Sequence, residues 1–413
     1  MKALVRLYIN SYKGLSPAAW LLALVMLINR TGSMVIPFLG IYMSSELGFS
    51  KTQIGLVLGC FGLGSVAGSW LGGWLTDRFG NFKVQSWSLV LVIPLFLILP
   101  LFRSFEGLAG MIFILTLVAD TFRPANSVSV ARYAKPENIT RAYSLNRMAV
   151  NLGFSIGPAL GGFLATFSYN WIFYGNAIAA SIAVVVFIYF FRNKKGNSQY
   201  THQETKKSSE QQTIPERNAY RDGLFIGFNF FCFLFSMAFF QLITTLPLFY
   251  RDVHQLDSSQ IGLLLGFSGF VIVLFEMVLI HLIENRMTVR QIMLMGTAIA
   301  AASYYMLNFD FGMIWLFLAM LVLSTGEMLT LPFTATISIQ RAGKNNQGAY
   351  MGFNSLAFAA ANIFSPYLGT YIAEHFGYNV LWTTTGTVLL VVSIAFYWII
   401  SKMNFVHKAH ELG

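Results

Sequence analysis

Five ionisable residues stand inside long apolar stretches of this 413-residue sequence: Arg30, Asp120, Arg123, Glu276 and Glu327. A charged side chain at the centre of a bilayer costs about 2.5–3.5 kcal/mol on insertion scales, so a residue of this kind usually has a function. The chemistry open to these residues is reversible. A carboxyl group can take up and release a proton, and an arginine can bind an anionic group of another molecule. We therefore predict proton coupling for the three carboxylates and substrate binding for the two arginines.

Glu327 is the first choice among the carboxylates. It has no opposite charge nearby in its own predicted helix, and an unpaired carboxyl group in a low-dielectric cavity is suited to carry a proton reversibly. Asp120 and Arg123 are three residues apart, which predicts that they share one helix face and could simply neutralise each other. Glu276 could instead pair with a neighbour. Arg147 is a secondary candidate, because its long side chain could reach the lipid head groups.

A second set of residues would supply hydrogen bonds to a bound molecule. They are amide and phenol side chains in stretches that otherwise consist of Phe, Leu and Ile. A mostly aromatic cleft with a few polar groups suits amphipathic organic molecules. The predicted substrate-binding residues are Arg30, Asn29, Arg123, Asn126, Asn151, Gln241, Tyr304, Tyr305, Glu327 and Asn354, with Tyr42 as a further candidate for the same wall.

Composition indicates which elements must position these side chains. Hydrophobic residues make up 56% of the chain and charged residues 11%, a balance foreign to soluble domains. A bilayer core of about 30 Å needs about 20 apolar residues per helix. Stretches of this kind recur along the chain and predict an all-α membrane protein with twelve transmembrane helices. The predicted spans are 17–42, 51–75, 84–102, 108–133, 142–166, 171–191, 222–249, 259–283, 290–308, 313–340, 348–372 and 379–400.

The net charge of +10 is distributed unevenly along the chain. Outside the predicted helices, most lysines and arginines lie at the two ends of the chain or in the even-numbered turns. Lys51, Arg103 and Arg251 are the exceptions. Basic residues gather on the cytoplasmic side of membrane proteins. We therefore expect both termini in the cytoplasm and a multi-pass protein of the inner (plasma) membrane, and the basic charge implies no nucleic-acid partner.

One polar segment divides the chain into two halves. Residues 192–221 are rich in Lys, Glu, Gln and Ser and poor in aliphatic residues. This composition predicts a cytoplasmic linker between a six-helix bundle at 1–191 and another at 222–413. Its lysine-rich runs could bind anionic head groups, but a solvated connector is the preferred interpretation.

An internal repeat supports the division into halves. KTQIGLVLG at 51–59 returns as SSQIGLLLG at 258–266, and Pro158 with Gly161 returns as Pro366 with Gly369. Each nine-residue copy follows a serine or aspartate placed three residues before a glutamine, the spacing of a capping box. The repeat therefore predicts the start of the second helix of each half, and its glycines predict close helix packing.

The sequence GGWLTDRFGNFK at 72–83 follows the second predicted helix. In a chain of two six-helix repeats it resembles the cytoplasmic signature of the major facilitator superfamily, with matches at Gly73, Asp77, Arg78, Gly80 and Lys83. The resemblance covers essentially the whole chain and implies two pseudo-symmetric six-helix bundles that work by alternating access. It also implies that these five residues form a conformational latch.

The fifth predicted helix carries a second motif, formed by Gly153, Gly157, Pro158, Gly161 and Gly162. It resembles the GxxxGPxxGG pattern of the drug:proton antiporter branch of the superfamily. The resemblance implies a bendable, closely packed helix where the halves meet. The alternative is that these residues serve tight packing alone.

Other segments are similar to proton-coupled oligopeptide transporters. They are FRPANSVSV at 122–130, YSLNRMAVNLG at 143–153 and the run from Gly326 and Glu327 to Pro332. In that family the glutamate faces the amino terminus of the peptide. The first-helix ExxER motif of the family corresponds to MLINR at 26–30, which keeps Arg30 and lacks both glutamates.

These observations predict a secondary active transporter, most directly a proton-coupled antiporter that exports a small amphipathic organic compound. The alternative is a proton-coupled importer of peptide-like substrates, and a non-transporting sensor on the same fold is a third hypothesis. The sequence has no HExxH motif, nucleotide-binding loop or metal-ligand cluster, so we expect no enzyme activity, no cofactor and no metal. Cys60 and Cys232 fall in predicted spans and predict no disulfide. The expected partners are the substrate, protons and the lipid bilayer, and the protein is expected to work as a monomer.

Overall fold

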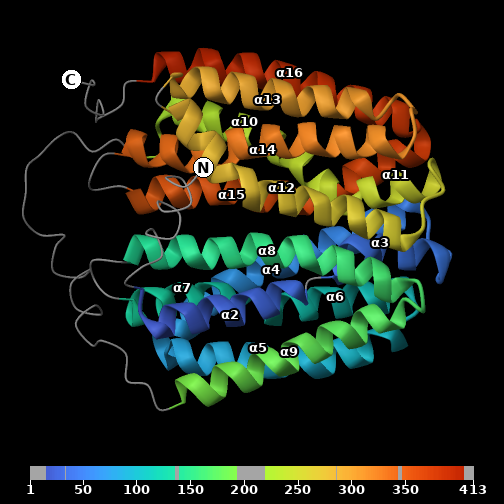
Figure 1. Cartoon of the computed structure of the whole chain (residues 1–413), viewed down its shortest axis with the longest axis vertical. Helices are drawn as coiled ribbons and strands as arrows, with labels where there is room; N and C mark the ends of the chain where they lie inside the picture. Colours follow the sequence, from blue (N-terminus) through green and yellow to red (C-terminus); the bar gives the residue numbers. More distant parts are fainter. Residues whose placement is uncertain are drawn as a thin grey trace, which may run out of the picture. The chain divides into compact units, whose positions relative to one another are not determined.

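The computed structural model describes residues 15–32, 34–134, 139–192, 219–284, 286–342 and 347–403. The described residues form helices joined by short turns, and they contain no strand. The helices of the first half, shown in Figure 1, are α2 (Pro17–Thr31), α3 (Val35–Ser45), α4 (Lys51–Phe79), α5 (Asn81–Ile98), α6 (Phe105–Asp120), α7 (Phe122–Tyr133), α8 (Ile139–Ala165) and α9 (Asn170–Phe191). Those of the second half are α10 (Gly223–Thr244), α11 (Leu246–Asp252), α12 (Ser258–Glu284), α13 (Val289–Met306), α14 (Met313–Ala342), α15 (Gln347–His375) and α16 (Tyr378–Lys402).

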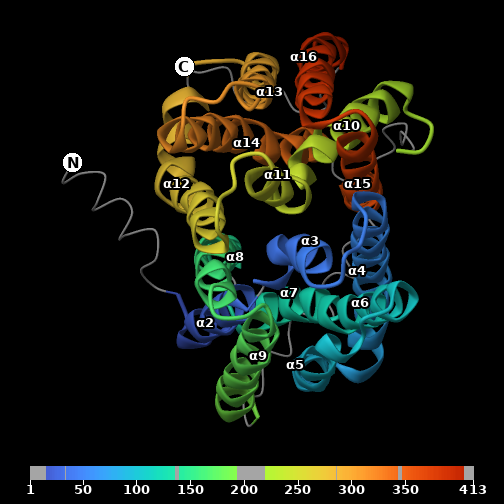
Figure 2. The ribbon, with the colours of Figure 1, turned by 90° about the vertical axis from the view of Figure 1, so that its right-hand side faces the viewer.

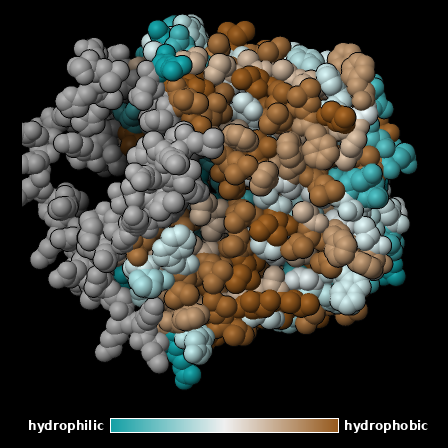
Figure 3. Space-filling view, viewed as in Figure 1, coloured by the Kyte–Doolittle hydropathy of each residue, from teal (hydrophilic) through white to brown (hydrophobic). Residues whose placement is uncertain are grey.

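The prediction of an all-α membrane protein is confirmed. The described residues provide 11 candidate membrane spans, judged by length and hydropathy. A helix also lies at the remaining predicted span, 290–308. This helix, α13, has 18 residues and is less apolar, because it carries Arg290 and Gln291 in its first turn and two tyrosines in its last turn. On the face shown in Figure 3, hydrophobic side chains cover the lengths of the helices and hydrophilic side chains gather at their ends.

Three predicted spans each consist of two consecutive helices. The pairs are α2 with α3, α6 with α7, and α10 with α11. In every pair the second helix has a proline among its first three residues, namely Pro37, Pro124 and Pro247. Proline lacks the N–H that would bond the carbonyl four residues earlier, so it is tolerated in a first helical turn but interrupts a continuous helix. Proline accounts for the start of each second helix but does not by itself decide the interruption, because Pro94, Pro158, Pro332 and Pro366 lie inside continuous helices.

The interruption in the fourth span lies between Asp120 and Arg123. Asp120 is the last residue of α6, Thr121 lies between the helices with φ −63° and ψ −22°, and Arg123 belongs to α7. No described ion pair joins the two side chains, so their mutual neutralisation stays a prediction. Asp120 is buried, whereas the side chain of Arg123 is exposed.

Contacts divide the chain into two compact units, and each unit includes the copy of the repeat that comes from the other half of the sequence. Unit 1 comprises Met1–Tyr42, Cys60–Lys207 and Leu256–Gly266, and unit 2 comprises Met43–Gly59, Ser208–Gln255 and Phe267–Gly413. The first copy of the repeat, at 51–59, thus belongs to unit 2, and the second, at 258–266, belongs to unit 1. Residues 193–218 of the predicted linker lie outside the described residues.

Close backbone contacts explain why the repeat contains glycine. In unit 2, a methyl group at Gly55 would lie 2.8 Å from the Cα of Tyr367 on α15. In unit 1, a methyl group at the equivalent Gly262 would lie 2.5 Å from the carbonyl oxygen of Pro158 on α8. Both distances are too short for any larger residue. Each copy of the repeat therefore starts a helix that touches another backbone directly.

The predicted capping boxes are confirmed at both copies. The Ser50 N–H donates to Gln53 Oε1 at 3.0 Å, and the Gln53 N–H donates to Ser50 Oγ at 3.2 Å. Asp257 and Gln260 form the same reciprocal pair, at 3.0 and 2.8 Å. These bonds satisfy N–H groups that have no partner within the helix.

Each unit has its own helix packing, which the end-on view of Figure 2 shows. In unit 1, α2 packs against α8 and α9, and α5 packs against α9 and α7. A buried hydrophobic cluster with members on all five of these helices fills the space between them. In unit 2, α13 packs against both α14 and α16, and α10 packs against α15.

A buried ion pair fixes one end of the unit 2 bundle. Asp222, the N-cap of α10, accepts hydrogen bonds at 2.8 Å from Arg341 Nε and at 3.1 Å from the Tyr350 hydroxyl. The side chains of Asp222 and Arg341 are only 6% and 5% exposed. Burial acts to raise the pKa of Asp222, but the bonds from Arg341, the Phe225 N–H and Tyr350 outweigh it and hold that pKa below its usual value. Three helices, α10, α14 and α15, are thereby joined.

We expect Asp222→Asn to destabilise the protein, because it leaves the Arg341 guanidinium buried without a counter-ion. Loss of one partner of a buried pair costs about 3–5 kcal/mol. Thermal unfolding in detergent at pH 7 should show a lower melting temperature for the variant. Because the pKa of Asp222 is lowered on folding, the advantage of the wild type should be complete at neutral pH and shrink as the pH falls below about 4.

Asp257→Asn is the matched control for this experiment. Asp257 is also a helix N-cap, but its side chain is exposed, and asparagine caps helices as well as aspartate does. Its melting temperature should stay close to that of the wild type. Equal melting temperatures for both variants would show that the buried pair does not stabilise the bundle.

Candidate functional site

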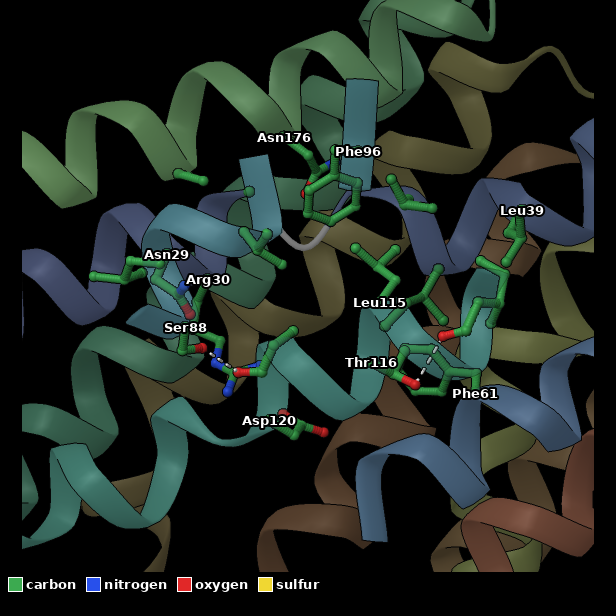
Figure 4. Close-up of a pocket in the computed structure, with 18 residues that line it drawn as sticks. Asn29, Arg30, Leu39, Phe61, Ser88, Phe96, Leu115, Thr116, Asp120 and Asn176 are labelled. Carbon is green, nitrogen blue, oxygen red and sulfur yellow. Dashed lines mark hydrogen bonds between the residues drawn. The ribbon is translucent and has the colours of Figure 1, made fainter. Parts of the chain in front are cut away.

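A cavity of about 100 Å³ lies inside unit 1 between α2, α3, α4, α5, α6 and α9. Most of its wall is aliphatic and aromatic, and Figure 4 shows how the side chains converge on it. Two of the predicted substrate-binding residues and one predicted proton-coupling residue line it. The polar lining residues are Asn29, Arg30, Ser88, Thr116, Asp120 and Asn176.

Arg30 brings a positive charge to this cavity. It lies in the last turn of α2, and its guanidinium carbon is 5.8 Å from the centre of the Phe154 ring. The Nε atom is buried and has no hydrogen-bond partner in the described part of the chain. The guanidinium interacts electrostatically with Asp120 and, unfavourably, with Arg123. A buried donor without a partner is costly, so this position is suited to bind an acceptor group of a ligand.

Asp120 is held at the end of α6 by short hydroxyl side chains. Its carboxylate accepts a hydrogen bond from Ser65 on α4. The Ser88 hydroxyl on α5 bonds the carbonyl of Val118 at 2.7 Å and reaches that of Ala119. These carbonyls lie at the interruption between α6 and α7, where helical donors are missing. None of the described ion pairs joins Asp120 to either arginine.

The sequence did not reveal four polar residues of this site: Ser65, Ser88, Thr116 and Asn176. Their signal was the same as for the predicted residues, a polar side chain in an apolar span. Such residues often bond the backbone of their own helix. Thr116 does so with the carbonyl of Ile112 at 2.9 Å, and Asn176 with that of Ile172 at 2.9 Å. Spacing alone therefore does not distinguish a lining residue from a self-satisfied one.

The second candidate place surrounds Glu327 inside unit 2. Glu327 lies near the middle of α14 and is 2% exposed. Neither carboxylate oxygen has a hydrogen-bond partner among the described residues. Tyr304 on α13 is near enough to interact with it electrostatically. An ionised carboxylate without a partner in such a place would cost several kcal/mol, so this conformation favours the protonated acid.

Two glycines bring Tyr304 beside Glu327. A methyl group at Gly326 would lie 2.7 Å from the Gly296 carbonyl oxygen, and one at Gly296 would lie 2.7 Å from Leu329 Cβ. The absence of side chains here lets α13 and α14 approach closely. The Tyr304 hydroxyl then donates to the Ala238 carbonyl of α10 at 2.5 Å.

The other predicted binding residues in unit 1 lie outside the cavity wall. Asn126 is buried and donates to the Asn146 side chain at 3.2 Å. Asn151 is half-buried on α8, and Arg123 is exposed on α7. Tyr42 is buried and makes an edge contact with the Phe173 ring at 5.2 Å. Their binding roles stay predictions.

The remaining predicted residues of unit 2 are dispersed. Asn354 donates to Asn229 at 2.9 Å, and Tyr305 bonds Thr387 on α16 at 2.8 Å. Gln241 is buried against Gly369, where a methyl group would lie 2.6 Å from its side-chain nitrogen. Glu276 is half-buried on α12 and is not without an interaction partner. The structure thus brings Glu327 together with Tyr304 but not with these residues.

The predicted latch residues lie at and around the turn between α4 and α5: Gly73, Asp77 and Arg78 belong to α4, Gly80 joins the two helices and Lys83 belongs to α5. Gly80 has a φ of 86°, a conformation that side chains disfavour, which explains the glycine of the motif. Asp77, Arg78 and Lys83 are exposed, and Gly73 has open space beside it. The Arg78 guanidinium lies 5.3 Å from the Trp74 ring, and no described ion pair includes Asp77 or Arg78. A latch role stays a prediction.

The glycines of the fifth-span motif pack against the helix that carries Arg30. A methyl group at Gly153 would collide with Arg30 Cβ, and one at Gly157 would lie 3.1 Å from the Thr31 carbonyl oxygen. Gly161 faces Met34 in the same way, at 2.7 Å from its Cβ. Gly162 faces the backbone of residues 258–262, which belongs to the same unit, and Pro158 lies inside α8. These contacts give the motif a packing function and position Arg30.

We expect Gly153→Ala to impair transport more than it impairs folding, because the added methyl group must displace Arg30. Gly110→Ala is the matched control, since Gly110 lies within α6 with nothing near its missing Cβ. In proteoliposomes, the first variant should lose most substrate flux and the control should keep it. Equal flux in both variants would show that the position of Arg30 is unimportant.

Known proteins resemble this chain in sequence and in fold. The sequence matches the family model of the Major Facilitator Superfamily at residues 19–366 and 290–411. It is 28% identical over 379 residues to the uncharacterized MFS-type transporter YttB of Bacillus subtilis, covering 91% of this chain and 93% of that one. It is 24% identical over 346 residues to Multidrug resistance protein 2 of Bacillus subtilis, covering 81% and 83%. A crystal structure of a POT family transporter in complex with 5-aminolevulinic acid has the same fold, with a TM-score of 0.78, 18% identity and coverage of 94% and 96%.

Proposed function

The chain belongs to the major facilitator superfamily and is a multi-pass membrane transporter, and we propose that it exports a small amphipathic organic compound in exchange for protons. The observation that carries this proposal is the burial of Glu327 without a partner for either oxygen. A proton carrier must be neutral when enclosed and must release its proton when its surroundings become polar. Glu327 meets the first condition, and a change between conformations supplies the second.

Asp120 is the second proton-coupling candidate and has a different environment. It accepts a hydrogen bond from Ser65 and lies near the positive charge of Arg30. Both contacts engage its carboxylate, so Asp120 is placed to balance Arg30 or a cationic group of a substrate, whereas neither oxygen of Glu327 has a partner among the described residues. We therefore place Glu327 first.

Export of amphipathic compounds has two supports. The wall of the unit 1 cavity is mainly apolar with a few polar groups, which suits a molecule of mixed character. The chain is also 24% identical to a protein named for multidrug resistance. We place the protein in the plasma membrane with both termini in the cytoplasm, as the distribution of basic residues predicts.

Import of peptide-like substrates is the second candidate function. Arg30 favours it, because an unpartnered guanidinium nitrogen at a cavity is suited to bind a carboxylate. In that case Arg30 would hold the carboxyl end of the substrate, and proton movement would accompany entry.

Proteoliposomes that contain a pH-sensitive dye test the proposal. We expect lipophilic cations such as tetraphenylphosphonium to change the internal pH with the wild-type protein, because each exported molecule is exchanged for protons. Glu327→Gln keeps the shape of the side chain but cannot exchange a proton, so its response should fall to that of protein-free vesicles. Glu106→Gln, at an exposed position of α6, removes a carboxylate elsewhere and should respond like the wild type.

Two outcomes would contradict this proposal. A wild-type rate of uphill transport by Glu327→Gln would show that another group couples protons. A pH response to a dipeptide mixture alone, with none to the cations, would favour the peptide-like importer, and Arg30→Gln should then abolish that response.

A further inference from the structure

A continuous group of aromatic rings in unit 2 leads from the turn after α11 to the neighbourhood of Glu327. The Phe249 ring makes edge contacts with His254 at 5.0 Å and with Trp382 at 5.2 Å. Trp382 stacks on Tyr304 at 5.7 Å, and Tyr304 is the neighbour of Glu327. These residues come from α11, α13, α14 and α16, so the group is a product of the tertiary structure.

Several polar atoms within this group are buried and have no partner in the described part of the chain. They include the Tyr250 hydroxyl, Nε2 of His254 and both oxygens of Glu327. Buried polar atoms are normally hydrogen-bonded, and those without a protein partner are where internal water binds. Tyr304 differs, because its hydroxyl proton is already donated to Ala238. The hydroxyl with free hydrogen-bonding capacity is therefore that of Tyr250, which interacts electrostatically with Tyr304, and Trp382 Nε1 is a further buried donor without a partner in the described residues.

His254 stands at the surface end of the group. Its side chain is 6% exposed, and its Nδ1 lies 3.6 Å from a carboxylate oxygen of Asp310, which is 69% exposed. One ring nitrogen thus faces a solvated acid while the other, Nε2, is buried. Tyr250 lies near the end of α11, and its ring centre is 6.5 Å from that of His254, which follows this helix in the turn.

Histidine changes its charge near neutral pH and can take a proton on one nitrogen while releasing one from the other. Burial lowers the pKa of His254, and the Asp310 carboxylate opposes this effect. Asp310 and Tyr250 are the titratable groups that face the imidazole in the described part of the chain, and Tyr304 and Glu327 lie beyond Tyr250. A neutral imidazole that is protonated only in passing suits a relay.

From this geometry we propose that protons reach Glu327 from the outer surface through His254 and Tyr250. A proton from water or Asp310 binds Nδ1 of His254, and the proton on Nε2 passes to the Tyr250 oxygen through water. Tyr250 releases its own hydroxyl proton towards a carboxylate oxygen of Glu327. Each group ends with the proton count with which it began, and the Glu327 carboxylate gains the proton. This inference rests on the proposed function, in which Glu327 carries the coupled proton.

Tyr378 provides a matched control within the same group of rings. It stacks on Trp382 at 6.2 Å and contacts Phe249 at 5.3 Å, as a relay residue would. Its hydroxyl, however, donates to Asp252 at 2.8 Å, and Lys51 binds the same carboxylate at 3.1 Å. The hydroxyl is therefore committed to a surface ion cluster. Its removal takes a hydroxyl away from the same group of rings without interrupting the proposed route.

The test measures two kinds of flux in proteoliposomes with tetraphenylphosphonium as the probe. Proton-coupled flux is the dye response under a pH gradient, and exchange flux is the swap of labelled for unlabelled probe at equal pH, which moves no net protons. We expect His254→Gln and Tyr250→Phe to slow the proton-coupled flux about tenfold and to leave exchange within about twofold of the wild type. Tyr378→Phe should leave both fluxes unchanged, and the pH dependence of the remaining flux in His254→Gln should be flatter.

The possible failures are distinguishable. Wild-type proton-coupled flux in both His254→Gln and Tyr250→Phe would overturn the route while leaving the proposed function intact. Equal slowing of exchange in these variants, or equal slowing by Tyr378→Phe, would also overturn it, because the residues would then act through packing. Absence of any proton-coupled flux in the wild type would instead overturn the proposed function and the route together.

Discussion

Satisfaction of backbone hydrogen bonds in an apolar surrounding is the constraint on which the rest of this structure depends. Without water, each N–H and C=O group needs an internal partner, and helices provide one for nearly all of them. The exceptions lie where prolines interrupt spans. At the interruption between α6 and α7, hydroxyl side chains bond a backbone carbonyl, as both Ser88 and Thr121 do for Val118, at 2.7 and 2.8 Å. Ser88 thereby connects the wall of the unit 1 cavity to the backbone at this interruption.

The two halves share one helical framework but give their buried carboxylates different electrostatic surroundings. Pro124 and Pro332 occupy equivalent places in the repeat, and each follows a buried carboxylate by four or five residues. Asp120 has acquired a hydroxyl donor and a neighbouring arginine. Glu327 has neither, although its burial is at least as complete. The two halves therefore differ in that one buried carboxylate has partners, whereas the other has none among the described residues.

Glycine contacts connect this chemistry to the packing of the helices. Gly153 positions the backbone of Arg30, and Gly326 positions Tyr304 beside Glu327. Gly153 lies on α8 and Arg30 on α2, whereas Gly326 and Glu327 are neighbours on α14. Close approach without a hydrophobic driving force is typical of membrane helices. A substitution at either glycine would therefore affect the functional side chain through direct contact, without a long-range mechanism.

The sequence by itself determined where the helices lie, where the repeated helices begin and which apolar spans hold charged residues. These features depend on local periodicity, on capping spacing and on the cost of charge in an apolar stretch, so Arg30, Asp120 and Glu327 were identifiable without a structure. Only the tertiary structure decided which polar groups meet. It placed an interruption between Asp120 and Arg123, joined Ser65 to Asp120 and Ser88 to the cavity, and brought His254 beside Tyr250 and Tyr304 beside Glu327. Those contacts depend on helix rotation and on close approach at glycines far away in the sequence, which no local pattern specifies.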